Sequence, residues 1–218
     1  MMNNIFNRSY DDLTFLSMQM INNENLDKYI FVFDFDLTMT TMSTNNIDID
    51  NFSTNNIKYY TLFDSKEKIN KLTLLLSKIN NNNCPIYINT RALINHVNFI
   101  LNKINFDLSL IKDIKGSYHD DMINNPLTIN EIEQYNLTST LQSNVSWALK
   151  KVIYLNEIKI SENVSYDKIL FFDDSKININ TAKINGYMNS FLIGSNDSGL
   201  VGLDYLLIKL EQIINILF

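Results

Sequence analysis

Short apolar runs alternate with longer amphipathic stretches along most of the chain. The apolar runs have the length of buried strands, and we expect strands at residues 28–34, 86–88, 106–111, 168–174 and 190–194. Between the runs, apolar residues recur every three or four positions, which is typical of helices with one buried face. We expect helices at residues 11–22, 64–80, 93–104, 144–158, 175–185 and 203–217. This alternation predicts an α/β fold, a doubly wound parallel sheet of about five strands with helices on both faces.

Local signals mark the ends of two predicted helices. Asp64 is followed three residues later by Glu67, a spacing that resembles a capping box and starts a helix at Asp64. The dipeptide Asn185-Gly186 is a helix-stop signal. The apolar face of the last helix, 203–217, is assigned to core packing rather than to a membrane or partner surface.

The length and composition fit one domain. The chain has 218 residues, of which 45% are apolar, so we expect a single domain, 1–218, with a full core. The net charge of −6 argues against general affinity for nucleic acid, which requires clustered Lys and Arg. A local basic groove stays open, as does the oligomeric state.

The cysteine content and the hydropathy bear on the cellular setting. The chain has one cysteine, which excludes an internal disulfide and fits a reducing compartment. It shows no signal peptide and no run of about 18 apolar residues, so we expect no transmembrane segment. These features predict a cytoplasmic protein, with signal-independent secretion as an open alternative.

Three predicted strands end in polar residues. These residues are Asp34 and Asp36, then Asn89, Thr90 and Arg91, then Asp173 and Asp174. Because ligands bind outside the carboxyl ends of parallel strands, we expect these side chains to share one site. Several carboxylates at one edge would repel each other without a cation. A hard divalent ion with oxygen ligands, Mg²⁺ first, is the simplest remedy.

Four sequence motifs at these places resemble those of the haloacid dehalogenase-like (HAD) superfamily, in its DxDxT phosphatase type. The matches are FDFDLTMT at 33–40 for the first motif hhhDxDxT, IYINT at 86–90 for the second, Lys150 or Lys151 for the third, and LFFDDS at 170–175 for the fourth. The resemblance covers roughly residues 28–195. It implies a HAD-like core with a small cap or none.

The resemblance also implies roles for the four aspartates. Asp34 would be the nucleophile that forms an aspartyl-phosphate, and Asp36 would be the general acid and then the base. Asp174 would hold Mg²⁺ together with Asp34 and the main-chain carbonyl of Asp36. Asp173 would support the metal site from behind, in either a structural or a catalytic role.

The remaining candidates would bind the phosphoryl group. Thr90 would donate to a phosphoryl oxygen, or Asn89 in its place if the strand ends one residue earlier. Arg91 is either a phosphate ligand or a solvated residue at a helix start. Lys150 and Lys151 lie about 100° apart on a helix, so only one can face the site. We prefer Lys150, because Lys151 falls closer to the polar face of its helix.

Two polar stretches are placed where the family inserts caps. Residues 40–64 are long enough for a flap, and residues 116–146 for a lid or specificity insert. Small caps leave a site open to macromolecules, so we expect a phosphoprotein phosphatase, with phosphotyrosine as one option. The alternatives are a phosphatase of nucleotides or sugar phosphates and a HAD-like binding module without useful turnover.

Overall fold

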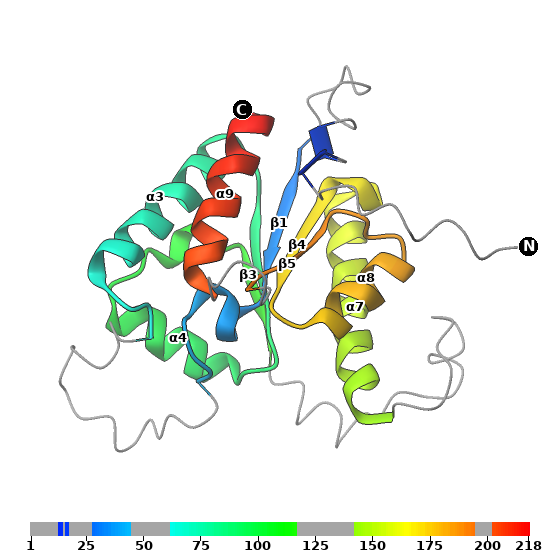
Figure 1. Ribbon diagram of the computed structural model, residues 1–218, viewed down its shortest axis with the longest axis horizontal. Coiled ribbons are helices and arrows are strands. Elements are labelled where there is room, and N and C mark those ends of the chain that lie inside the picture. Colours follow the sequence, from blue (N-terminus) through cyan, green and yellow to red (C-terminus); the bar gives the residue numbers. More distant parts are fainter. Residues whose placement is uncertain (1–12, 15, 18–27, 45–61, 117–141, 195–201) are drawn as a thin grey trace, which may run out of the picture.

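The structure is a computed structural model that describes residues 13–14, 16–17, 28–44, 62–116, 142–194 and 202–218, and only the backbone of residues 142–146 (Figure 1). Its centre is an all-parallel sheet of five strands in the order β3-β2-β1-β4-β5. The strands are β1 (Ile30–Phe33), β2 (Ile86–Asn89), β3 (Asp113–Lys115), β4 (Ile169–Asp173) and β5 (Ser190–Leu192). The predicted α/β fold is confirmed.

Helices cover both faces of this sheet, as Figure 1 shows. One face carries α3 (Lys66–Asn81), α4 (Ile94–Lys103) and α9 (Leu203–Leu217), and the other carries α7 (Gln142–Glu162) and α8 (Lys176–Ile184). Three short turns complete the described chain: η1 (Phe35–Met39), η2 (Leu108–Leu110) and η3 (Tyr166–Lys168). Of the predicted helix 11–22, residues 13, 14, 16 and 17 are helical and the rest lies outside the described residues. No described helix combines the length and the apolar character that crossing a bilayer requires.

The central strand β1 is apolar on both faces because each face packs under helices. Phe31 and Phe33 join the core beneath α3, α4 and α9, whereas Ile30 and Val32 join the core beneath α7 and α8. The ring of Phe33 stacks on Phe172 of β4 at 4.8 Å between centroids. A strand buried on both sides has no polar face, which is why it appears in the sequence as an unbroken apolar run.

The predicted third strand at residues 106–111 is wrong. The carboxylate of Asp107 accepts hydrogen bonds from the Ser109 amide at 3.0 Å and from its hydroxyl at 2.6 Å, and the chain forms the turn η2 there. Asp and Ser side chains compete in this way with the hydrogen bonds of a sheet. The strand at this edge, β3, instead lies at Asp113–Lys115. Two of its three residues are charged, so its sequence shows no apolar run.

The helix boundaries confirm two signals and correct one. Helix α9 spans the predicted residues, and its face is buried in the core. The stop at Asn185-Gly186 is confirmed, with Gly186 at a φ of 95°. The predicted cap Asp64 is wrong, because Ser65 caps α3 by accepting from the Lys68 amide at 3.3 Å. Asp64 lies outside the helix at a φ of 65° and pairs with the Lys68 ammonium group.

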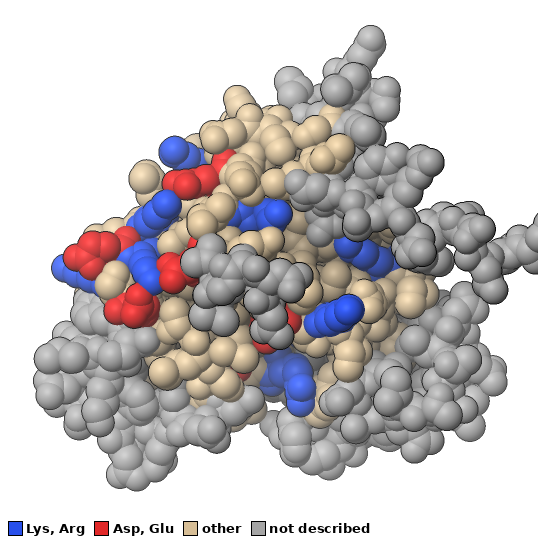
Figure 2. Space-filling view, in the orientation of Figure 1, with Lys and Arg blue, Asp and Glu red and all other residues tan. Residues whose placement is uncertain are grey.

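The start of α9 is fixed against the loop that follows β1. Gly202 has a φ of 51°, and a Cβ atom there would lie 2.7 Å from the carbonyl oxygen of Thr40 and 2.8 Å from that of Leu37. Lys68 of α3 binds Asp204 in the first turn of α9 at 2.8 Å. Acidic and basic side chains are interleaved on this side of the molecule (Figure 2).

A second ion cluster joins the end of α7 to the amino ends of β1, β2 and β3. The Glu162 side chain is 4% exposed and accepts from Lys28 at 2.8 Å, and it is also bound by Lys112 and by the hydroxyl of Tyr87. Burial raises the pKa of Glu162, but its bonds with Lys112, Lys28 and Tyr87 outweigh burial and lower that pKa to about 2. The carboxylate is therefore charged and fully paired at neutral pH.

We expect Gly202→Ala to destabilise the protein more than Gly186→Ala. At Gly186 an added Cβ meets only a Tyr166 ring carbon at 3.4 Å, so the cost is the positive φ alone, about 1–2 kcal/mol. At Gly202 two main-chain oxygens must also move, and we expect a loss of roughly 3 kcal/mol or more. Urea unfolding midpoints measure both losses, and equal losses would contradict the close approach.

Glu162→Gln should destabilise the protein in a pH-dependent way. The pKa of Glu162 is lower in the folded protein than its ordinary value of 4.5, so its stabilisation is complete above that value and disappears as the pH falls to about 2. At neutral pH the expected loss is about 2 kcal/mol. The control is Glu157→Gln, whose partner Lys115 lies 3.8 Å away and whose side chain is 55% exposed; its expected loss is below about 0.5 kcal/mol. Urea unfolding at several pH values measures these losses. A loss that does not change with pH would contradict the charge-based explanation.

Candidate active site

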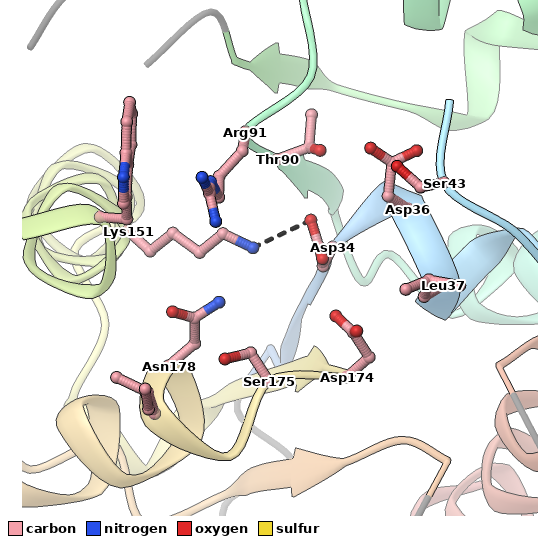
Figure 3. A pocket seen from close by; sticks show the side chains of 12 residues that line it. Asp34, Asp36, Leu37, Ser43, Thr90, Arg91, Lys151, Asp174, Ser175 and Asn178 are labelled. Atoms are coloured by element: carbon pink, nitrogen blue, oxygen red, sulfur yellow. Dashed lines mark ion pairs between the residues drawn. The ribbon is translucent and has the colours of Figure 1, made fainter. Parts of the chain in front are cut away.

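The carboxyl ends of β1, β2 and β4 border a cavity of about 270 Å³. Twelve residues line it: Asp34, Asp36, Leu37, Ser43, Thr90, Arg91, Trp147, Lys151, Asp174, Ser175, Ile177 and Asn178 (Figure 3). Strand β1 lies in the middle of the sheet, and the chain runs outward from it first through β2 and later through β4. The cavity therefore lies where the strand order reverses, the usual ligand site of such sheets.

The strand register brings the predicted polar residues to one level. Phe33 is in register with Ile88 of β2 and with Phe172 of β4. The next residue of each strand is then Asp34, Asn89 or Asp173. The Asp34 amide continues the sheet by donating to the Phe172 carbonyl at 2.8 Å.

A buried lysine joins two of the three strand ends. The Lys151 Nζ atom lies 2.6 Å from Asp173 Oδ2, to which it donates a hydrogen bond, and 2.9 Å from Asp34 Oδ1. The second contact is an ion pair without hydrogen-bond alignment, marked by the dashed line in Figure 3. The side chains of Lys151 and Asp173 are 1% and 0% exposed. Charges this deeply buried are tolerated only when they are paired, so each of these residues depends on the others.

Asp173 supports the site from below rather than lining the cavity. Its carboxylate accepts from the Ser175 amide at 2.8 Å and from the Asn178 side chain at 2.9 and 3.1 Å, in addition to Lys151. These donors hold Asp173 in one orientation, and Asp173 in turn orients Lys151. Asp173 therefore lies behind Lys151, and its support of a metal ion stays a prediction.

Three carboxylates could hold a metal ion. Asp34, Asp173 and Asp174 each offer an oxygen, and these oxygens all lie within 4.8 Å of one another. Asp34 Oδ1 is buried and accepts no hydrogen bond from any described residue, although the Lys151 ammonium group lies 2.9 Å from it. Grouped carboxylate oxygens are the donors that hard divalent cations prefer.

The electrostatics of the cluster favour an added cation. Burial raises the pKa of Asp173 to about 6, in spite of the opposing charge of Lys151. Burial, followed by the charge of Asp34, raises the pKa of Asp174 to about 7. Burial lowers the pKa of Lys151, but the charges of Asp173 and Asp34 more than offset this, so that its pKa is raised and it stays protonated. One lysine thus faces three acids, and a cation would relieve the excess of negative charge.

Asp36 stands apart from this cluster. In the view of Figure 3 its carboxylate lies beside Ser43, on the other side of Asp34 from Lys151. One of its oxygens accepts from the Thr44 amide at 2.8 Å and from the Thr44 hydroxyl at 2.6 Å. Phe35, between the two acids, is fully buried in the core, so Asp34 and Asp36 both border the cavity while Phe35 does not.

The preference for Lys150 over Lys151 is wrong. It is Lys151 that reaches Asp34 and Asp173. Lys151 lies three residues after Ala148 and four before Leu155, both buried, so it belongs to the inner face of α7. A lysine normally marks the solvent side of a helix, but here its long stem runs through the core and carries the charge to the cavity.

The last residue of β2 and the two residues after it have different roles. Asn89 does not line the cavity, so its predicted phosphate contact is not supported. Its side-chain amide instead donates to the Lys151 main-chain carbonyl at 3.1 Å. Thr90 is buried and lines the cavity, and its hydroxyl accepts from the Ala92 amide at 3.2 Å. Arg91 also lines the cavity, and its guanidinium group lies 4.6 Å over the ring of Trp147.

Sequence reasoning missed several residues of the site. Trp147 precedes Lys151 by one helical turn, so the two residues share one face of α7. A prediction of Lys151 as the site lysine would also have predicted Trp147. Asn178 was hidden because asparagine is abundant throughout the chain, and Thr44 because it lies in a stretch predicted to be irregular. Residues 45–61 of the predicted flap and 117–141 of the predicted insert lie outside the described residues, so both cap assignments stay predictions.

Comparisons with known proteins add no assignment. Models of known protein families give no match to the sequence, and a search of curated proteins finds no significant similarity. The function is therefore argued from the geometry of the cavity and from the sequence motifs that border it.

Lys151→Met should destabilise the protein by about 3–5 kcal/mol, because it leaves Asp34 and Asp173 buried without their partner. Lys150→Met is the matched control, with an expected loss below about 1 kcal/mol. Adding Asp173→Asn to Lys151→Met should recover part of the loss, since it removes one uncompensated charge. Urea unfolding of the four proteins measures these values. Equal losses at the two lysines would contradict the buried ion pairs.

Proposed function

We propose that the protein is a Mg²⁺-dependent phosphatase of the HAD type, which hydrolyses phosphomonoesters through an aspartyl-phosphate. One observation supports this most directly: Asp34 ends the central strand with Lys151 Nζ 2.9 Å away and with Asp173 and Asp174 in the same group of carboxylates. A carboxylate nucleophile needs neighbouring positive charge to approach a phosphate dianion. The buried lysine and the metal-binding acids supply the two sources of that charge.

In the first step, an oxygen of Asp34 attacks phosphorus. A bond forms between this oxygen and phosphorus, and the bond from phosphorus to the leaving oxygen breaks. Lys151 offsets the charge that gathers on the phosphoryl oxygens, and the Thr90 hydroxyl donates to one of them. Asn178 and Ser175 act indirectly, because they hold Asp173 and so fix Lys151.

Asp36 transfers the protons. It gives a proton to the leaving oxygen in the first step, and it then takes one from the water that attacks the aspartyl-phosphate. The hydrogen bonds from Thr44 hold one of its oxygens and leave the other to face the reaction. Phosphate leaves, and Asp34 regains its carboxylate.

A magnesium ion fits beside Asp34. The carboxylates of Asp34 and Asp174 and the main-chain carbonyl of Asp36 would hold it, with Asp173 supporting the site. When bound, it supplies charge neutralisation and positions the phosphoryl group.

Phosphoproteins are the preferred substrate class, with phosphotyrosine as one option. The net charge of −6 provides little attraction for a polynucleotide. Nucleotides and sugar phosphates are the alternative substrates, and a binding module without turnover is the alternative function. We place the activity in the cytoplasm, on the basis of the single cysteine.

The purified protein should hydrolyse p-nitrophenyl phosphate, with activity lost on chelation and restored by Mg²⁺. We expect Asp34→Asn to lower kcat at least about 10³-fold, because it removes the nucleophile, and Asp36→Asn to lower it about 10²–10⁴-fold. The control is Asp64→Asn, a change of an exposed acid in a surface ion pair, which should leave kcat unchanged.

Two results would refute the proposal. Full activity of Asp34→Asn, or activity that chelation does not affect, would exclude this mechanism. If the unmodified protein turns over no phosphoester but still binds phosphate, the binding-module alternative is correct.

A further inference from the structure

The rim of the cavity differs in chemistry from its floor. The floor consists of charged and polar side chains, which suit a phosphoryl group. The rim carries two large apolar side chains that face solvent: Leu37, which is 40% exposed, and Ile177, which is 39% exposed. It also carries the Arg91–Trp147 pair, with the guanidinium group 4.6 Å from the centre of the indole ring.

Leu37 occupies a backbone conformation that disfavours it. Its φ is 59° and its ψ is 2°, a left-handed conformation that non-glycine residues adopt only at a cost in free energy. Surrounding contacts maintain this conformation: the Leu37 amide donates to the Thr40 hydroxyl at 3.1 Å, and Gly202 packs against the Leu37 carbonyl. The result is a strained residue whose apolar side chain is held at the mouth of the cavity. Strain of this kind gathers at functional sites, where the surrounding structure maintains it.

The Arg91–Trp147 pair connects the end of β2 with α7. Stacking on the indole ring restrains a flexible side chain and keeps a flat cationic group beside the cavity. Flat groups of this kind bind aromatic rings by stacking, and alkyl groups gain much less from them. The rim therefore combines two apolar side chains with a planar cation.

The cavity can hold the reacting part of an aryl phosphate. Its volume is about 270 Å³, which is compatible with a phosphoryl group and one ring.

We propose that Leu37, Ile177 and the Arg91–Trp147 pair form a leaving-group subsite that selects an aromatic ring bonded to the phosphate, that is, an aryl phosphomonoester. The inference rests on the proposed function, because the floor of the cavity must hold the phosphoryl group. In this arrangement the ring lies between the apolar side chains and the guanidinium group, and the ester oxygen faces Asp36. The ring comes either from a phosphotyrosyl side chain or from a free aryl phosphate.

Trp147 allows a direct binding test. It is the only tryptophan among the 218 residues, so tryptophan fluorescence reports on the rim alone. The Asp34→Asn protein with Mg²⁺ is titrated with phenyl phosphate, a phosphotyrosyl peptide, the matching phosphoseryl peptide and inorganic phosphate. We expect both aryl phosphates to change the fluorescence and to bind about tenfold more tightly than the other two. If the phosphotyrosyl peptide binds more tightly than phenyl phosphate, the natural substrate is a phosphoprotein. If the two aryl compounds bind with equal affinity, the natural substrate is a small aryl phosphate.

The Leu37→Gly variant distinguishes an effect on ligand binding from an effect on folding stability. Glycine relieves the strain of the positive φ, so the urea unfolding midpoint should stay the same or rise. The affinity for phenyl phosphate should fall about tenfold, while that for inorganic phosphate is unchanged. Leu74→Ala removes another exposed leucine, 58% exposed on α3, and should change neither affinity.

The two proposals fail in different ways. If inorganic phosphate binds but the phosphoseryl and phosphotyrosyl peptides bind equally, before and after Leu37→Gly, the subsite is refuted and the proposed function stands. If no phosphate compound binds either to the Asp34→Asn protein or to the unmodified protein with Mg²⁺, both are refuted.

Discussion

The buried ammonium group of Lys151 is the interaction on which the rest of the structure depends. Parallel strands end at one edge of the sheet, so Asp34 and Asp173 are forced together, and their charges oppose folding unless a cation lies between them. Lys151 provides that cation from α7, and its main-chain carbonyl accepts from Asn89 of β2. One residue thus joins a helix to three neighbouring strands at the level where the cavity begins.

The two ends of the strands handle acidic groups in opposite ways. At their amino ends Glu162 is bound by two lysines and a tyrosine, and its pKa is lowered to about 2. At their carboxyl ends a single lysine faces three carboxylates, and the pKa of Asp174 is raised to about 7. The first arrangement is complete within the protein itself. The second retains unbalanced charge, and a residue shifted in this way is a typical member of a functional site.

The sequence predicts the central strands and most of the site, and the same burial pattern explains which residues it fails to predict. Strands β1, β2 and β4 are buried on both faces, so their apolar runs stop where the polar site begins. Strand β3 lies at the edge and is short and charged, so no apolar run announces it. Lys151 was assigned to the wrong side of α7 because residue type cannot show that a charged group is needed inside. Thr44 and Asn178 are found only once the fold places them beside Asp36 and Asp173.

The contact between Gly202 and the loop after β1 has a consequence for protein synthesis. The carbonyl groups of Leu37 and Thr40 are covered by a residue that the ribosome adds after all five strands of the sheet. The nascent chain can assemble Lys151 with Asp34 and Asp173 before that point, whereas the loop that carries Asp36 acquires its final support only as α9 emerges. Asp36 is therefore secured later in synthesis than the Lys151 cluster, although the two lie on opposite sides of the same aspartate.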